Sequence, residues 1–152
     1  MVIDFSQDEK VGVIFTLLQI LKAGDKDNPY KQEYLDILVR KKLFIKDDDI
    51  KKLHSELASP LGLANICNNI SSMNNEKKFA LLVMMMKMGY LGGNVTQNIK
   101  DVGEYLIAIF NLPSQELEIA QIVNKEEIIE YYTTDTLSEE EAKEFLKRTG
   151  WV

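Results

Sequence analysis

Apolar residues recur at helical spacing along almost the whole chain, and this periodicity constrains the fold more than any other feature. After Ser6, apolar side chains recur every three or four residues from Val11 to Leu21, which places them on one face of a helix. Ser6 and Glu9 have the spacing of a capping box at the start of this helix, and Gly24 can end it. Alternating strand patterns and Asn-Gly hairpin turns do not occur in the sequence. The sequence therefore predicts an all-α protein.

Later helices are marked by capping side chains, often beside a proline. These start signals occur at Asn28-Pro29, Asp47, Ser59-Pro60, Asn74 or Asn75, Gln97, Pro113-Ser114 and Ser138. The run from Phe79 to Met88 is apolar on all sides, so we expect this helix at the centre of the core. Together the signals predict a compact bundle of about seven to nine helices.

The chain also matches itself when it is shifted by 67 residues without gaps. Matched pairs from three successive helices are Ile14 with Leu81, Leu35 with Val102, and Leu53 with Ala120. Because three helices and two loops keep one register, we predict two pseudo-repeated three-helix halves, at about 6–58 and 74–122. The halves form a core of residues 1–124, and residues 125–152 form a C-terminal helical appendage packed on it. We expect these core residues to be buried where the halves meet: Phe15, Leu18, Leu38, Leu82, Met85 and Leu106.

Each half combines a hydrophobic helix, a short loop and an amphipathic helix. Leu17–Ile50 carries the first half, with the turn Ala23–Asp27 between its helices, and Phe79–Leu117 carries the second. This tandem resembles the tellurite-resistance TerB-like domains of bacteria, which show an Ala-x-x-Asp-Gly type of turn at the position of Ala23–Asp27. The resemblance implies an all-α fold and an accessory role in a stress response.

Composition and charge exclude several classes of function. The 18 basic and 24 acidic residues give a net charge of −6, which argues against binding nucleic acid through a basic face. The longest apolar runs are too short to insert in a membrane. One Cys and one His cannot build a zinc cage or a disulfide framework. The acidic N-terminus lacks a signal-peptide pattern and the lone Cys67 suits a reducing compartment, so we expect a cytoplasmic protein.

The residues with catalytic potential lack the partners that catalysis requires. His54 has Leu57 and Ala58 three and four positions on, and neither can orient an imidazole. Cys67 lies among apolar residues, which indicates a core thiol. The run Met84–Met86 either packs in the core or forms an adaptable binding groove. The sequence therefore predicts no catalytic residues, no cofactor site and no enzyme.

Acidic residues in the first inter-helix loop are the candidate metal ligands. Asp25 and Asp27 can contribute carboxylate oxygens to a divalent cation, and Asp47–Asp49 can add to them. An EF-hand that begins at Asp25 is excluded because Pro29 and Tyr30 would occupy its fifth and sixth positions. The alternative interpretation is that Asp25 and Asp27 only solvate a turn and that Asp47–Asp49 interact with a helix dipole.

The appendage offers the candidate partner surface. Tyr131, Tyr132 and Trp151 are residue types that contribute strongly to protein interfaces, although they can equally cover an apolar groove on the core. We therefore expect a small cytoplasmic helical interaction or stress-response accessory module that is not an enzyme and that binds a protein partner or itself. The alternative hypothesis is a divalent-metal-binding protein that uses the acidic loop.

Overall fold

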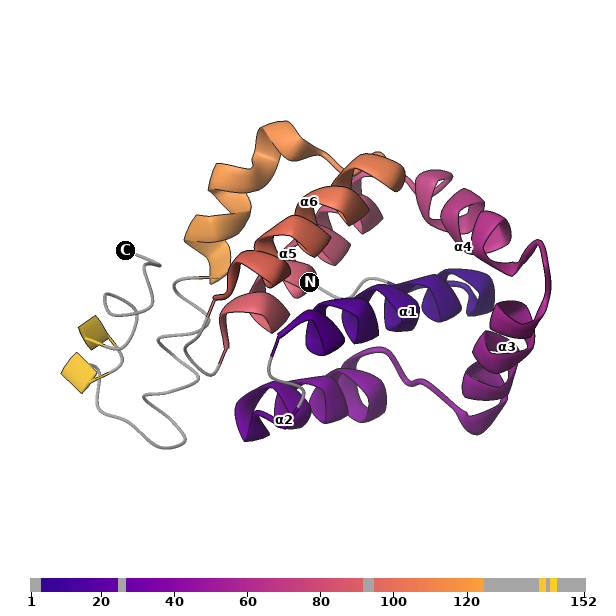
Figure 1. The fold of residues 1–152 in the computed structure, drawn as a ribbon, viewed down its shortest axis with the longest axis horizontal. Coiled ribbons are helices and arrows are strands. Elements are labelled where there is room, and N and C mark those ends of the chain that lie inside the picture. The colour runs from indigo at the N-terminus through magenta and orange to yellow at the C-terminus, as the bar shows by residue number, and fades with distance from the viewer. Residues whose placement is uncertain (1–3, 25–26, 92–94, 125–139, 142, 145–152) are drawn as a thin grey trace.

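The computed structural model describes residues 4–24, 27–91, 95–124, 140–141 and 143–144. Within these ranges every regular element is helical, which confirms the predicted all-α fold class (Figure 1). The elements are α1 (Gln7–Ala23), α2 (Pro29–Ile37), the π-helical turn η1 (Leu38–Lys42), α3 (Asp47–Ala58), α4 (Gly62–Ser71), α5 (Asn75–Tyr90), α6 (Gln97–Ile109) and the 3-10 turn η2 (Ser114–Glu116), which continues as helical residues 117–124. Among the described residues, none of these helices is long and apolar enough to cross a membrane.

Helix α1 lies at the centre of the molecule and contacts α3, α4, α5 and α6. Figure 1 shows α5 and α6 side by side next to α1, with α3 and α4 towards the other end. The expected core residues Leu38, Leu82, Met85 and Leu106 are buried. The remaining two, Phe15 and Leu18, are only half-buried. They pack against the buried core as partly covered neighbours of its residues.

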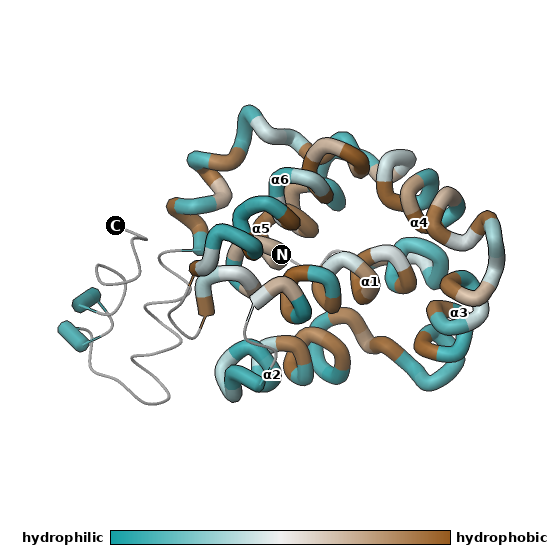
Figure 2. Tube along the Cα trace, in the orientation of Figure 1, coloured by the Kyte–Doolittle hydropathy of each residue, from teal (hydrophilic) through white to brown (hydrophobic). Residues whose placement is uncertain are grey.

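Helices α3, α4 and α6 have distinct apolar and polar faces, and Figure 2 shows hydrophobic and hydrophilic segments alternating along the chain trace. Buried polar contacts join α2 to α5. Lys31, almost fully buried, donates from Nζ to the carbonyl oxygen of Gly89 at 3.1 Å. Nearby, Nζ of Lys87 lies 4.9 Å from the centre of the Tyr34 ring, in a cation–π contact. These contacts satisfy two charged groups that would otherwise destabilise the interior.

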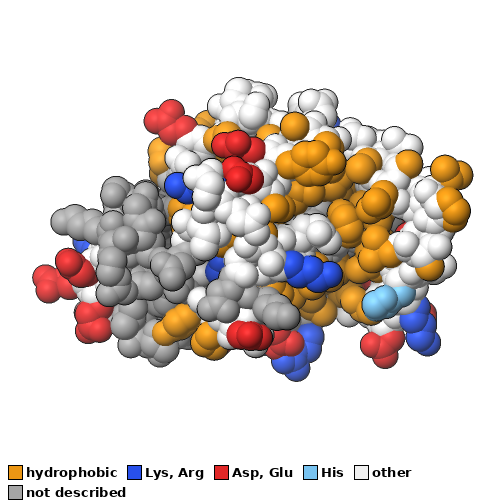
Figure 3. Space-filling model, viewed as in Figure 1, with side chains coloured by type: hydrophobic (Ala, Val, Ile, Leu, Met, Phe, Trp, Pro, Cys, Tyr) orange, Lys and Arg blue, Asp and Glu red, His pale blue; other side chains and the backbone are white. Residues whose placement is uncertain are grey.

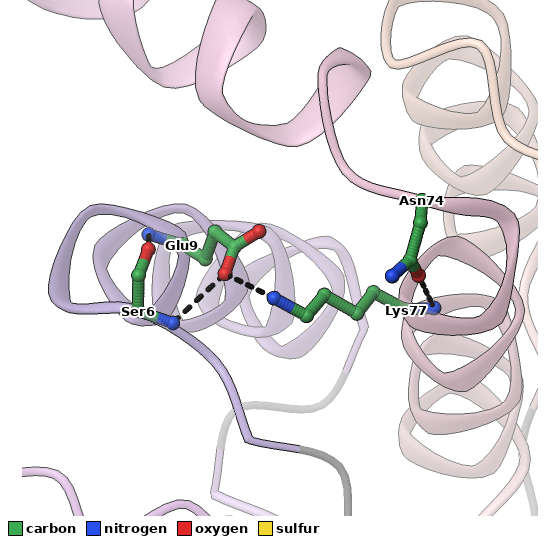
Figure 4. Close-up of polar contacts among 4 residues, drawn as sticks. All are labelled: Ser6, Glu9, Asn74 and Lys77. Carbon is green, nitrogen blue, oxygen red and sulfur yellow. Dashed lines mark hydrogen bonds and ion pairs between the residues drawn. The ribbon is translucent and has the colours of Figure 1, made fainter.

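A polar joint connects the first turns of α1 and α5 (Figure 4). The predicted capping box is confirmed, because Glu9 accepts from the backbone N–H of Ser6 at 2.8 Å and donates its own N–H to Ser6 Oγ at 3.2 Å. The same Glu9 oxygen accepts from Lys77 Nζ at 2.8 Å. Asn74, the predicted cap of α5, accepts from the backbone N–H of Lys77 at 2.9 Å. The two helix starts are therefore fixed to each other.

The start of α2 follows its sequence signal, whereas α3 and α4 differ from theirs. Asn28 caps α2 with Pro29 at the first helical position, as predicted. Helix α3 is capped at Lys46 rather than Asp47, because the side chain of Asp49 accepts from the Lys46 N–H at 2.9 Å and fixes that residue outside the helix. Helix α4 begins at Gly62 instead of at the Ser59-Pro60 pair, which forms the preceding turn.

Structural landmarks recur along the chain at two spacings. The N-caps Ser6 and Asn74 lie 68 residues apart, as do Asn28 and Thr96 (positions 28 and 96). The left-handed residues Phe44 and Asn111, each with φ of 51°, lie 67 residues apart (positions 44 and 111). The segment from Asn28 to Phe44 is thus one residue longer than the segment from Thr96 to Asn111, and the N-caps before it do not follow the gapless 67-residue register of the sequence match. The turn η1 lies in this segment, and a π-helical turn is the usual way for a helix to hold one extra residue.

Candidate interaction surface

A tight turn joins α3 to α4 and holds three leucines in solvent. The N–H of Ser59 donates to the carbonyl oxygen of Glu56, and the N–H of Gly62 donates to that of Ser59, both at 3.1 Å. A Cβ atom at Gly62 would lie 1.5 Å from the Glu56 carbonyl oxygen, so only glycine fits at this close approach. The leucines at 57, 61 and 63 are 46%, 68% and 56% exposed.

The inner face of α4 packs on α1 and fixes the orientation of the helix. Ile66 and Ile70 are fully buried against α1. At Gly12 of α1 the two helices approach so closely that a Cβ atom there would lie 2.7 Å from Cγ1 of Ile70. Because the inner face is fixed in this way, the opposite face of α4 must point into solvent.

The outer face of α4 and the turn before it carry no charge. Residues 57–75 contain no Asp, Glu, Lys or Arg, although charged residues make up 28% of the chain. We call seven exposed residues of this segment the α4 surface; they are Leu57, Ala58, Leu61, Leu63, Ala64, Asn65 and Asn68. Figure 3 shows hydrophobic and uncharged side chains gathered over α4, with the charged side chains on other parts of that face. Depletion of charge is the main compositional signal of an interface core.

The polar side chains of the α4 surface are the amides of Asn65 and Asn68, and Cys67 and Ser71 lie half-buried on the same helix. The side-chain amide of Asn65 donates to Oε2 of Glu56 at 3.3 Å, which connects α4 to the end of α3. Ser71 donates from Oγ to the carbonyl oxygen of Cys67 at 2.7 Å. Burial raises the pKa of the Cys67 thiol, so this half-buried group stays protonated and is a poor nucleophile. The surface therefore offers contact area rather than reactive chemistry.

The residues singled out from the sequence lie elsewhere. His54 is exposed on α3, and Met85 is buried while Met84 and Met86 are half-buried. Asp27 is exposed in the loop before α2, and Asp25 lies outside the described residues. Tyr131, Tyr132 and Trp151, like most of the predicted appendage, also lie outside the described part of the chain.

The second acidic cluster has a structural role at one of its positions. Asp49 is buried and accepts the Lys46 N–H, whereas Asp47 and Asp48 are exposed at the start of α3. Among the described residues, no three His, Cys, Asp or Glu side chains are grouped so that they could hold a metal ion.

Sequence reasoning missed the α4 surface because it searched for catalytic and ligating side chains. The signal was nevertheless present in the sequence as the charge-free run 57–75. Comparison with known proteins found no matching family model, no matching curated protein and no matching solved structure. The resemblance to TerB-like domains therefore stays a prediction.

Proposed function

We propose that this chain is a cytoplasmic, non-enzymatic interaction module that assembles with a second copy of itself through the α4 surface. The observation that carries the proposal is the group of three exposed leucines in the charge-free segment 57–75: Leu57 at the end of α3, Leu61 in the turn and Leu63 at the start of α4. Large apolar side chains exposed close together are typical of a contact region.

A second copy is the partner that the charge distribution favours. The chain carries a net charge of −6, so two copies repel each other over most of their surface. Residues 57–75 themselves bring no charge to such a contact, although the carboxylate of Glu56 lies beside them and accepts from Asn65. The leucines can pack against their own counterparts across a two-fold axis. Such isologous dimers are the commonest oligomers. A charge-free surface also gives no electrostatic selectivity for a different, oppositely charged partner.

We further propose that the segments 6–58 and 74–122 are copies of one TerB-like unit. The matched N-caps 68 residues apart and the matched left-handed residues 67 residues apart support this proposal. The extra residue at η1 accounts for the change of spacing. An accessory role in a stress response rests on the resemblance to that family alone.

Sedimentation analysis of two matched variants tests the proposed assembly. Leu63→Glu introduces a charge at the centre of the α4 surface, and Ile119→Glu introduces the same charge at a residue of equal exposure, 55%, on another helix. We expect wild type and Ile119→Glu to dimerise with rising concentration and Leu63→Glu to stay monomeric, with similar melting temperatures for all three. A monomeric wild type, or a dimer that Leu63→Glu leaves intact, would refute the proposal.

A further inference from the structure

A cavity of about 240 Å³ opens between α5, α6 and helical residues 117–124, and α1 contributes to its floor. It lies apart from the α4 surface and shares no residue with it. The floor consists of side chains that are fully buried or nearly so: Ile20, Leu82, Met85 and Ile99. Met86 and Ile107 continue the apolar wall towards the opening. Methionine side chains are flexible and polarisable, so such a wall adapts to the shape of a hydrocarbon ligand.

Gly103 leaves space in this wall that the protein itself does not fill. It lies in the interior of α6, where glycine destabilises a helix relative to alanine. A Cβ atom at this position would meet no heavy atom within 4 Å. The other glycine of the wall, Gly89, differs, because a Cβ there would lie 3.1 Å from Cγ2 of Ile99. Packing within the chain thus explains Gly89 but not Gly103.

The opening of the cavity carries polar groups without a net charge. Lys100 and Glu104 are exposed on successive turns of α6, and their charges cancel. Tyr90 brings a half-buried phenol to the same rim, and burial raises its pKa, so the hydroxyl stays protonated. An uncharged hydrogen-bonding group suits this rim better than an anion or a cation, because either ion would face a like charge within one helical turn.

The size of the cavity limits the ligand. A cavity of about 150 Å³ holds benzene, which has six heavy atoms, so this one holds roughly ten. We infer that the cavity between α5 and α6 is a binding site for an uncharged, mainly hydrocarbon small molecule of this size, with its polar group at the rim and its apolar part against Met85, Met86 and Gly103. This site is independent of the proposed assembly through α4.

A series of 1-alkanols from butanol to dodecanol tests the inference on the full-length chain. Methyl NMR of labelled methionines reports binding at Met85 and Met86, with the buried Met73, which does not line the cavity, as an internal control. We expect the dissociation constant to fall about fourfold for each added methylene, up to about nine carbons, and then to level off. An affinity that keeps rising with chain length beyond nine carbons would overturn the assignment. Chemical-shift changes at Met73 as large as those at Met85 would also overturn it.

Two further comparisons test the location of the site and the chemical class of its ligand separately. Gly103→Leu adds four carbons inside the cavity, so we expect it to weaken nonanol binding more than tenfold and to move the limit to about five carbons. Ala108→Leu, at an exposed position of the same helix outside the cavity, should leave the affinity for nonanol and the chain-length limit unchanged. Equal binding by wild type and Gly103→Leu would refute the site. Nonanoate that binds tenfold more tightly than nonanol would refute the uncharged class of ligand.

Discussion

Two glycines inside helices should respond to alanine with opposite signs. Alanine stabilises a helix interior by about 0.5–1 kcal/mol relative to glycine. At Gly103 no heavy atom beyond the adjoining residues and backbone of α6 lies within 4 Å of the new methyl group, so Gly103→Ala should show this whole gain. For 152 residues the unfolding entropy is about 0.3 kcal/mol/K, so the melting temperature should rise by about 1.5–3 °C.

At Gly12 the same propensity gain meets a steric obstacle. The new methyl group would lie 2.7 and 2.9 Å from two carbons of the Ile70 side chain, which is fully buried. Overpacking of this kind costs about 1–3 kcal/mol, which exceeds the propensity gain, so Gly12→Ala should lower the melting temperature by up to about 8 °C. Differential scanning calorimetry of both variants beside wild type measures the two effects. A destabilised Gly103→Ala would mean that the space beside α6 is filled, and a stabilised Gly12→Ala would mean that α1 and α4 are not in close contact.

Three further substitutions test the core, the polar joint and the acidic loop. Leu82→Ala should lower the free energy of unfolding by about 2–5 kcal/mol in denaturant titrations, and a loss below about 0.5 kcal/mol would show that α5 is misplaced. Burial is the largest influence on the pKa of Glu9 and raises it, but hydrogen bonds from Lys77 and from the N-cap together outweigh burial and hold the pKa below its usual 4.5. Glu9 therefore contributes stability above about pH 4.5, and this contribution is lost as the pH falls through its lowered pKa. The difference in unfolding free energy between wild type and Glu9→Gln should therefore shrink on acidification. A difference that grows on acidification would contradict this sign. Replacing Asp25 and Asp27 with Asn should leave the melting temperature unchanged with or without Ca²⁺, Mg²⁺ or Mn²⁺, whereas calorimetric binding at micromolar affinity that disappears in this variant would establish the metal-site alternative.

Helix starts that depend on neighbouring residues could be predicted from the sequence. The hydroxyl of Ser6 and the amide of Asn28 satisfy N–H groups two or three residues away, so their effect is visible without the rest of the fold. By residue type alone, Asp47 is equally suited to cap α3. The carboxylate of Asp49, three residues after Lys46, fixes the start one residue earlier instead, and sequence patterns do not distinguish these two geometries.

Features that depend on distant contacts could not be predicted. Gly103 and Gly12 are both single glycines within helical patterns, and only the packing of α4 on α1 and the open wall of α6 distinguishes them. The half-burial of Phe15 and Leu18 depends on how many helices surround α1, which periodicity alone does not give. The α4 surface could be predicted only in part. Its lack of charged residues is visible in the sequence, whereas its exposure to solvent depends on the fold.

A distance measurement between two copies tests the proposed assembly most directly. A spin label at Asn65→Cys, in a Cys67→Ser background, reports from the α4 surface, and a label at Ile119→Cys in the same background reports from another helix. In a two-fold dimer through α4, double electron–electron resonance should give a sharp intermolecular distance for position 65 that is shorter than the distance for position 119. No dipolar signal from position 65, or a shorter distance from position 119, would contradict assembly through the α4 surface.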